Sequence, residues 1–471
     1  MVEELPKGHK TKILALFCLY RLVLDFIYIF WQEFFTGIAR LGVEESFDRY
    51  VLSWIPFLVL IFFYTCLFFN RDKLKTSFSQ QAMLLLILLS VIPFFSMYSA
   101  GVISDECCYY YNILFYVLLL VQVGINYFFY TNTTLSEIKN NNHYKICKIK
   151  KYFFVIMCSI TIFSIIVTFF YFVGGKLYLD GINVYEQRAF FSTIQNNMPR
   201  VLVYVLGFAN VIEIIMMIYC LHIKKYLYAV FLIIIWYMHF SLAAEKSVFL
   251  SVIMAVVIYL VAKKITMGRV IVFHIATALI CLFLACFKYI YYVIDCDQSD
   301  FFDVVSSLGS PIPADIFRRL VFLPVYLQNL YVGYFADRTP NYWGINPEYS
   351  IGPGLENYIS DVYFNSPLGH ANTGLLGDCF VNMGVYGVLV YPIVLGIILC
   401  CFDYVLKGKN AIIFMGLALW FANYIMNSVL TTIMVSHGGF VMLLMLWCFP
   451  DDNDGEQKEN EESIQRGQLD G

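Results

Sequence analysis

The chain has 471 residues, of which 60% are hydrophobic and 14% are charged, and its mean hydropathy is +0.70. Because soluble domains carry about 25% charged residues, this composition excludes a soluble enzyme. Uninterrupted apolar runs such as residues 82–95 exclude a transmembrane β-barrel, whose strands alternate apolar and polar residues. The formal net charge of −3 does not indicate nucleic-acid binding, which requires a basic face that neutralises several phosphates. The sequence therefore predicts an all-α polytopic integral membrane protein.

Apolar runs bounded by polar clusters predict about twelve transmembrane helices. They begin near residues 13, 51, 82, 112, 152, 200, 226, 248, 270, 374, 411 and 431. Each run approaches the length of about 20 residues that crosses a bilayer. We expect a further uncharged segment, residues 320–336, to form an interfacial or re-entrant helix. A thirteenth span there would place Lys407 and Lys409 on the outer side of the membrane.

Basic residues predict the orientation of these helices. On the twelve-helix topology, 20 of the 31 lysines and arginines lie on one side, together with both termini. The positive-inside rule makes that side cytoplasmic. We therefore expect a membrane domain over residues 1–450 and a disordered acidic cytoplasmic tail over residues 451–471. Two long loops, at about 175–199 and 295–373, then lie outside, and loops of such length are usually functional.

Nine basic residues remain on the outer side, where the charge rule disfavours them: Arg40, Arg49, Lys176, Arg188, Arg200, Lys246, Arg318, Arg319 and Arg338. An outward cation indicates an anionic partner near the membrane surface, and arginine suits bidentate phosphate contact. The alternative is a side chain that snorkels to lipid headgroups. We favour snorkelling for Arg40, Arg49 and Lys176, and an anionic ligand for Arg188, Arg318 and Arg319 in the two long loops.

Several polar residues within or beside the predicted spans have structural interpretations. Arg21 and Asp25 share one helical face, which favours an ion pair facing the bundle. The amides of Asn423 and Asn427 favour hydrogen bonds between helices. The pattern Asp295-Cys296-Asp297 favours an acidic rim over a metal site. The cysteines show neither a disulfide framework nor zinc-ligand spacing.

Other residues, outside these pairs, could carry acid–base chemistry. His370 lies just before the tenth predicted span, where an imidazole could act as a base near neutral pH. Glu245 should lie at the outer end of a tight hairpin beside Lys246, and both functional and structural interpretations stay open for it. Asp378 follows His370 in the same segment.

Five segments, taken in order, resemble the bacterial O-antigen or oligosaccharide repeat-unit polymerases called Wzy. They are YRLVLDFIYIFW (20–31), AEKSVFLSVI (244–253), PADIFRRLVFLPVYL (313–327), YFADRTPNYW (334–343) and HANTGLLGDCFVNMGVYGVLVYPIVLG (370–396). The resemblance implies a GT-C-like membrane glycosyltransferase with large third and fifth periplasmic loops. Those are the two long loops found here.

The resemblance also implies substrates and residue roles. The substrates would be oligosaccharides linked through pyrophosphate to undecaprenol, and the reaction would need no cofactor and no metal. Pyrophosphate binding falls on Arg188, Arg318 and Arg319, and extends to Arg200, Lys246 and Arg338. His370 is the candidate base, with Glu245, Asp361 and Asp378 behind it. The partners would be the lipid bilayer of the bacterial inner membrane and a polysaccharide chain-length regulator.

Two alternatives stay open at this point. An O-antigen ligase-like enzyme uses the same donor but passes the glycan to the lipid A core. A lipid-linked oligosaccharide flippase, or another transporter, would place its polar site near the membrane midplane. The sequence shows no internal repeat of the kind that transporters usually carry.

Overall fold

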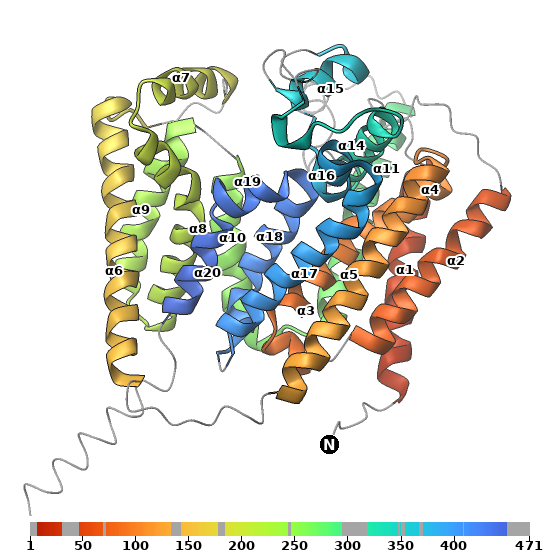
Figure 1. Ribbon diagram of the computed structural model, residues 1–471, viewed down its shortest axis with the longest axis horizontal. Coiled ribbons are helices and arrows are strands. Elements are labelled where there is room, and N and C mark those ends of the chain that lie inside the picture. The colour runs from red at the N-terminus through yellow and green to blue at the C-terminus, as the bar shows by residue number, and fades with distance from the viewer. Residues whose placement is uncertain are drawn as a thin grey trace, which may run out of the picture.

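The computed structural model describes residues 7–30, 47–68, 72–132, 143–177, 184–243, 246–293, 318–346, 349, 354–366, 371–407 and 409–449. These residues form one bundle of helices, and no β-strand occurs among them (Figure 1). The first half of the chain contributes α1 (Lys7–Phe30), α2 (Phe47–Phe63), α3 (Phe78–Leu86), α4 (Ile92–Ser99), α5 (Asp105–Asn132), α6 (His143–Val167), α7 (Val184–Asn196), α8 (Arg200–His222) and α9 (Tyr226–Ala243). The second half contributes α10 (Lys246–Val261), α11 (Met267–Val293), α14 (Leu323–Phe335), α15 (Leu355–Phe364), α16 (Gly374–Met383), α17 (Gly387–Val405), α18 (Met415–Asn427), α19 (Leu430–Val435) and α20 (Gly439–Cys448).

Eight helical stretches are long and apolar enough to cross a membrane: Asp48–Phe68, Phe78–Ser99, Asp105–Tyr127, Ile149–Phe172, Arg200–His222, Tyr226–Ala243, Gly374–Val405 and Leu430–Cys448. Three shorter apolar helices are Val248–Val261, Met267–Phe283 and Ala411–Asn427. Together with α1, these helices occupy every apolar run predicted from the sequence. The chain is an all-α, multi-pass membrane protein.

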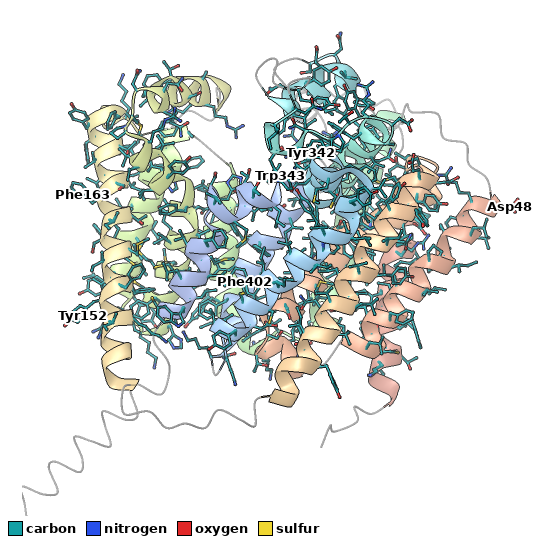
Figure 2. The ribbon with its side chains drawn as sticks, in the orientation of Figure 1. Asp48, Tyr152, Phe163, Tyr342, Trp343 and Phe402 are labelled. Atoms are coloured by element: carbon teal, nitrogen blue, oxygen red, sulfur yellow. The ribbon has the colours of Figure 1, made fainter. Side chains whose placement is uncertain are left out.

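The stretch Phe78–Ser99, which joins α3 and α4 through a π-helical turn, is the central helix of the bundle. Other parts of the protein bury 94% of its apolar window, whereas the other candidate spans are 33–67% buried. The outer helices expose apolar side chains instead. Phe163 on α6 and Leu227 on α9 are 68% and 84% exposed, and Figure 2 shows Phe163 pointing away from the bundle. Lipid therefore surrounds the outer helices and is excluded from the central one.

Polar contacts gather basic residues at one end of the bundle. Lys10 Nζ donates to the carbonyl of Cys66 at 3.3 Å, which places the start of α1 beside the end of the second span. Lys409 Nζ donates to the carbonyl of Phe449 at 2.8 Å, and Lys150 lies over the Trp447 ring. The first turn of α1 and the end of α20 are therefore at the same end, shown at the bottom of Figure 1.

A half-buried carboxylate fixes the N-terminus of α3 at this basic end. Asp403, near the end of α17, accepts hydrogen bonds from the backbone N–H of Ser79 at 2.9 Å and from the hydroxyls of Ser77 and Ser79. Negative charge at a helix N-terminus satisfies N–H groups that have no partner within the helix. The contact locks the central helix to α17.

The tenth predicted span is broken, contrary to the uninterrupted run that its apolar sequence indicates. Gly384 has φ +56° and ends α16, and α17 begins three residues later. A Cβ at Gly387 would lie 2.4 Å from the carbonyl oxygen of Cys379, so only glycine allows the two helices to approach so closely.

The segment predicted at 320–336 contains α14, which is not among the candidate spans. Its 13 residues extend about 20 Å, less than the roughly 30 Å hydrocarbon core. A single helical turn carrying Arg318 and Arg319 precedes it. Tyr326, Gln328 and Tyr331 are among its buried residues, and the helix packs mainly against α16.

The predicted ion pair between Arg21 and Asp25 forms, with Nε and Oδ2 3.5 Å apart and both side chains buried. The Arg21 guanidinium also lies 4.1 Å from the centre of the Trp54 ring and donates to the Ser53 carbonyl. The prediction that Asn423 and Asn427 form hydrogen bonds between helices was wrong. Asn427 donates to Asn423 within α18 and not to a neighbouring helix.

Candidate functional site

The end of the bundle opposite the basic end carries three short helices, α7, α14 and α15 (Figure 1). The predicted long loops are therefore partly helical. Helix α7 occupies residues 184–196 of the first loop, and α14 and α15 lie in the second. Because both loops meet the same end of the bundle, this end is the candidate functional site.

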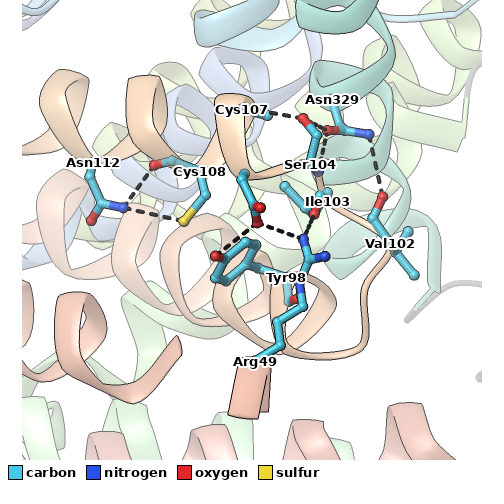
Figure 3. A network of polar contacts seen from close by, with 10 residues as sticks. Arg49, Tyr98, Val102, Ile103, Ser104, Cys107, Cys108, Asn112 and Asn329 are labelled. Atoms are coloured by element: carbon cyan, nitrogen blue, oxygen red, sulfur yellow. Dashed lines mark hydrogen bonds and ion pairs between the residues drawn. The ribbon is translucent and has the colours of Figure 1, made fainter. Parts of the chain in front are cut away.

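A polar network at this end anchors α14 to the first spans (Figure 3). Arg49, at the start of α2, donates from Nε to the Tyr98 carbonyl at 3.1 Å, and its NH2 group lies 3.1 Å from Asp105 Oδ1. The turn that precedes α5 also contacts α14, because Asn329 Oδ1 accepts from the Ser104 N–H at 3.0 Å. Arg49 thus stabilises the turn between α4 and α5. The sequence instead predicted that its side chain contacts lipid headgroups.

The opposite side of α14 is tied to α16. Gln328 Oε1 accepts from the N–H of Leu376 at 3.1 Å, and the Tyr331 hydroxyl donates to the Ala371 carbonyl at 2.6 Å. Gly374 has φ +64°, and a Cβ there would lie 2.4 Å from the Met426 carbonyl oxygen. The helix is therefore held on two sides, which fixes the arginines at its ends.

Those arginines do not converge. Arg319 is exposed and Arg318 is half-buried, in the helical turn before α14. Arg338 is exposed just beyond the other end of α14, with its guanidinium 3.8 Å from the centre of the Tyr334 ring. About 25 Å of helix separates Arg318 from the end of α14. One pyrophosphate cannot bridge that distance, so Arg338 and the Arg318–Arg319 pair form separate positions.

The contact between Arg338 and Tyr334 is a cation–π interaction. Burial, and then the hydrogen bond to the Tyr358 hydroxyl, raise the pKa of Tyr334. The phenol is therefore neutral at physiological pH, and the positive guanidinium is attracted by the face of the ring. The 3.0 Å contact between the Tyr334 and Tyr358 hydroxyls also joins α14 to α15.

The other predicted arginines lie on and beside α7. Arg188 is exposed on α7, and its neighbour Gln187 donates to the carbonyls of Ser241 and Leu242, each at 2.9 Å. These bonds hold α7 over the end of α9. Arg200 is exposed at the first residue of α8. Three arginine positions therefore occupy the same end of the bundle: one on α7–α8, one before α14 and Arg338 just beyond α14.

Asp378 lies on α16 beneath this surface and is completely buried. Its Oδ1 accepts from Asn382 Nδ2 at 2.6 Å and from the Tyr391 hydroxyl at 3.3 Å. Its Oδ2 accepts from the N–H of Leu430 at 2.7 Å. Both oxygens thus hold other parts of the protein in place. Asp361, by contrast, is exposed on α15.

The remaining predicted residues lie outside the described part of the chain. These are His370, Glu245, the Asp295-Cys296-Asp297 pattern and the side chain of Lys246, whose backbone begins α10. Among the residues that the structure describes, no three histidine, cysteine or acidic side chains are grouped so as to hold a metal ion.

The sequence interpretation missed a buried acid–histidine pair. Glu213 Oε2 on α8 lies 2.8 Å from His239 Nδ1 on α9, and the two side chains are 3% and 9% exposed. Glu213 Oε1 is buried without a hydrogen-bond partner among the described residues. A titratable residue in the middle of an apolar span is a functional candidate by default, and both positions interrupt such runs. That signal could have identified them.

Comparison of the chain with protein-family models, curated proteins and solved structures finds no match in any of the three.

Proposed function

We propose that the protein is a membrane glycosyltransferase of the GT-C type that joins undecaprenyl-pyrophosphate-linked oligosaccharide repeat units into a surface polysaccharide. The proposal includes twelve spans, cytoplasmic termini and a site at the periplasmic face of the bacterial inner membrane. One observation supports it most strongly. The two segments that carry Arg188 and the Arg318–Arg319 pair both lie at the end of the bundle opposite the one where Lys10, Lys150 and Lys409 gather.

The proposed reaction forms one glycosidic bond and breaks one glycosyl-phosphate bond. A hydroxyl at the non-reducing end of one lipid-linked repeat unit attacks the anomeric carbon of the growing chain. Undecaprenyl pyrophosphate leaves with the bonding electron pair, and a base accepts the hydroxyl proton. The glycosyl-pyrophosphate bond supplies the driving force. Arginines that hold the departing pyrophosphate stabilise the charge that develops on it.

Two substrates each bring a lipid pyrophosphate, and of the separate arginine positions at this end, the pair before α14 and the pair on α7–α8 each contain two arginines. Arg318 and Arg319 would bind one pyrophosphate, and Arg188 with Arg200 the other. Arginine suits both positions because its planar fork makes paired hydrogen bonds with phosphate oxygens.

The geometry of Asp378 supports a positioning role over that of the base. A base must reach the hydroxyl proton that it removes, and Asp378 has no exposed surface and engages both oxygens with protein donors. His370 remains the first candidate base, followed by Glu245 and Asp361.

Deletion of the gene tests the proposal. We expect the cells to carry single repeat units on the lipid A core in place of a polymer ladder, as seen by electrophoresis of lipopolysaccharide. If the product is a capsule, the same comparison applies to the capsular polysaccharide. Loss of even the single repeat unit would overturn the proposal and favour a ligase or a flippase.

The buried pair of Glu213 and His239 favours a second candidate, a transporter of lipid-linked oligosaccharide. Transporters hold their titratable groups inside the bundle, and this pair is buried between α8 and α9. Glu213→Gln distinguishes the candidates. A flippase would lose surface repeat units altogether, whereas a polymerase would keep at least single units.

A further inference from the structure

We propose that the turn carrying Tyr342 and Trp343 is a stacking platform for a pyranose ring of the glycan. The inference rests on the proposed function, since it assigns the carbohydrate contact of that same site. Tyr342 and Trp343 are 43% and 52% exposed, and Figure 2 shows them at the edge of the α14–α15 region, at the end of the bundle where α7 lies.

The backbone of this turn is strained. Tyr342 has φ +49°, and Trp343 has φ +58° and ψ +37°, so two consecutive aromatic residues adopt the left-handed conformation. Residues with a Cβ disfavour this region by roughly 1–2 kcal/mol each. A strained conformation persists only where the surrounding structure dictates it, and such residues cluster at functional sites.

Hydrogen bonds to α16 hold the strained turn in place. The N–H of Trp343 donates to Asn382 Oδ1 at 2.8 Å, and the N–H of Asn341 donates to the Val381 carbonyl at 2.6 Å. The Asn382 amide in turn donates to the buried carboxylate of Asp378. The indole of Trp343 is therefore presented from a backbone that α16 fixes, while its side chain remains half in solvent.

A fixed and exposed aromatic ring suits a sugar. The face of an indole or phenol carries negative charge, and the C–H groups on one face of a pyranose carry partial positive charge. A ring that only anchors the protein in the lipid interface needs the right depth and no strained backbone. The strain and the hydrogen bonds to Asn382 therefore favour an oriented ligand contact over an anchor.

The test measures binding directly and not polymerisation. The full-length protein is placed in lipid nanodiscs with Trp31→Phe and Trp447→Phe, so that Trp343 becomes the principal exposed tryptophan of the described residues. The probe is the soluble polysaccharide released from the host cell surface by mild acid. We expect the polysaccharide to shield Trp343 from iodide quenching, and Trp343→Ala to raise the dissociation constant, measured by calorimetry, roughly threefold to tenfold.

Two variants make the result specific. Trp343→Phe keeps an aromatic face and should retain most of the binding while losing the fluorescence change. Tyr386→Ala removes another exposed aromatic, 77% exposed just after the Gly384 kink, and should leave the dissociation constant unchanged. Asn382→Ala, which releases the Trp343 N–H, should weaken binding although the indole is still present.

The outcomes separate this inference from the proposed function. Iodide quenching that the polysaccharide leaves unchanged would overturn the platform. Quenching of Trp343 by brominated lipid instead of iodide would overturn it too, and would identify a membrane anchor. Shielding of Trp343 in a protein whose deletion leaves the polymer ladder intact would support the platform and overturn the polymerase.

Discussion

The backbone N–H of Leu430 donates to Asp378 Oδ2 at 2.7 Å, so a carboxylate on α16 holds the first residue of α19. The other oxygen of the same carboxylate holds Asn382, and through Asn382 the turn at Trp343. One buried side chain therefore connects the last spans of the bundle to the surface turn above α16.

Replacing Asp378 should destabilise the protein. We expect Asp378→Ala to lower the melting temperature of the purified protein, because each buried donor left without a partner costs about 1–3 kcal/mol. The melting temperature of Asp378→Asn should lie between those of the wild type and Asp378→Ala, since an amide keeps one acceptor oxygen. Thermal unfolding in detergent measures the effect, with Asp361→Ala on the exposed face of α15 as the control. A wild-type melting temperature for Asp378→Ala would contradict this assignment.

Removing either arginine before α14 should slow polymerisation. A charge-assisted hydrogen bond contributes about 1.5–3 kcal/mol, so Arg318→Ala and Arg319→Ala should each reduce transfer by roughly 10- to 150-fold. Lysine keeps the charge but loses the fork, so the lysine variants should retain partial activity. Polymer length and amount are compared between variants present in the membrane at equal protein levels. Lys176→Ala, at the same end of the bundle, is the control. If both alanine variants make wild-type polymer, these arginines only contact lipid headgroups and do not bind the pyrophosphate.

The topology can be tested by chemical labelling. In a background without cysteine, Ile345→Cys should react with a reagent that does not cross the membrane, because this residue is 79% exposed at the proposed periplasmic end. Asn140→Cys should react only after the cells are broken open. The reverse pattern would invert the orientation and remove the proposed site from the periplasm.

The break between α16 and α17 should tolerate no side chain at Gly387. A methyl group there would meet the Cys379 carbonyl oxygen at 2.4 Å, so Gly387→Ala should reduce the amount of folded protein or lower its melting temperature. At Gly333, on α14, a methyl group would have no described atom within 4 Å. Gly333→Ala should be neutral or stabilising by up to about 1 kcal/mol. Size-exclusion profiles and thermal unfolding of the two variants decide between these expectations.

The positions of the spans could be predicted from the sequence because crossing a bilayer requires long apolar runs, and each predicted run contains a helix. The break at Gly384 could not, since the flanking residues are as apolar as an unbroken span. The same holds for the turn at Trp343, whose conformation depends on Asn382, 39 residues later in the chain. Apolar pattern predicts where helices lie in the membrane, but not which distant partner bends or fixes them.

The burial of the stretch Phe78–Ser99 has a consequence for the biosynthesis of the protein. Asp403, which caps its N-terminal end, is 324 residues further along the chain than Ser79. At about 5–20 residues per second, the ribosome needs roughly 16–65 s to deliver that partner. During this interval the α3 half of the central helix, whose main neighbours are α17 and α18, must rest against lipid or against the insertion machinery. A nascent chain that ends before α17 would leave this helix without its final neighbours. Such a chain would be exposed to membrane proteases.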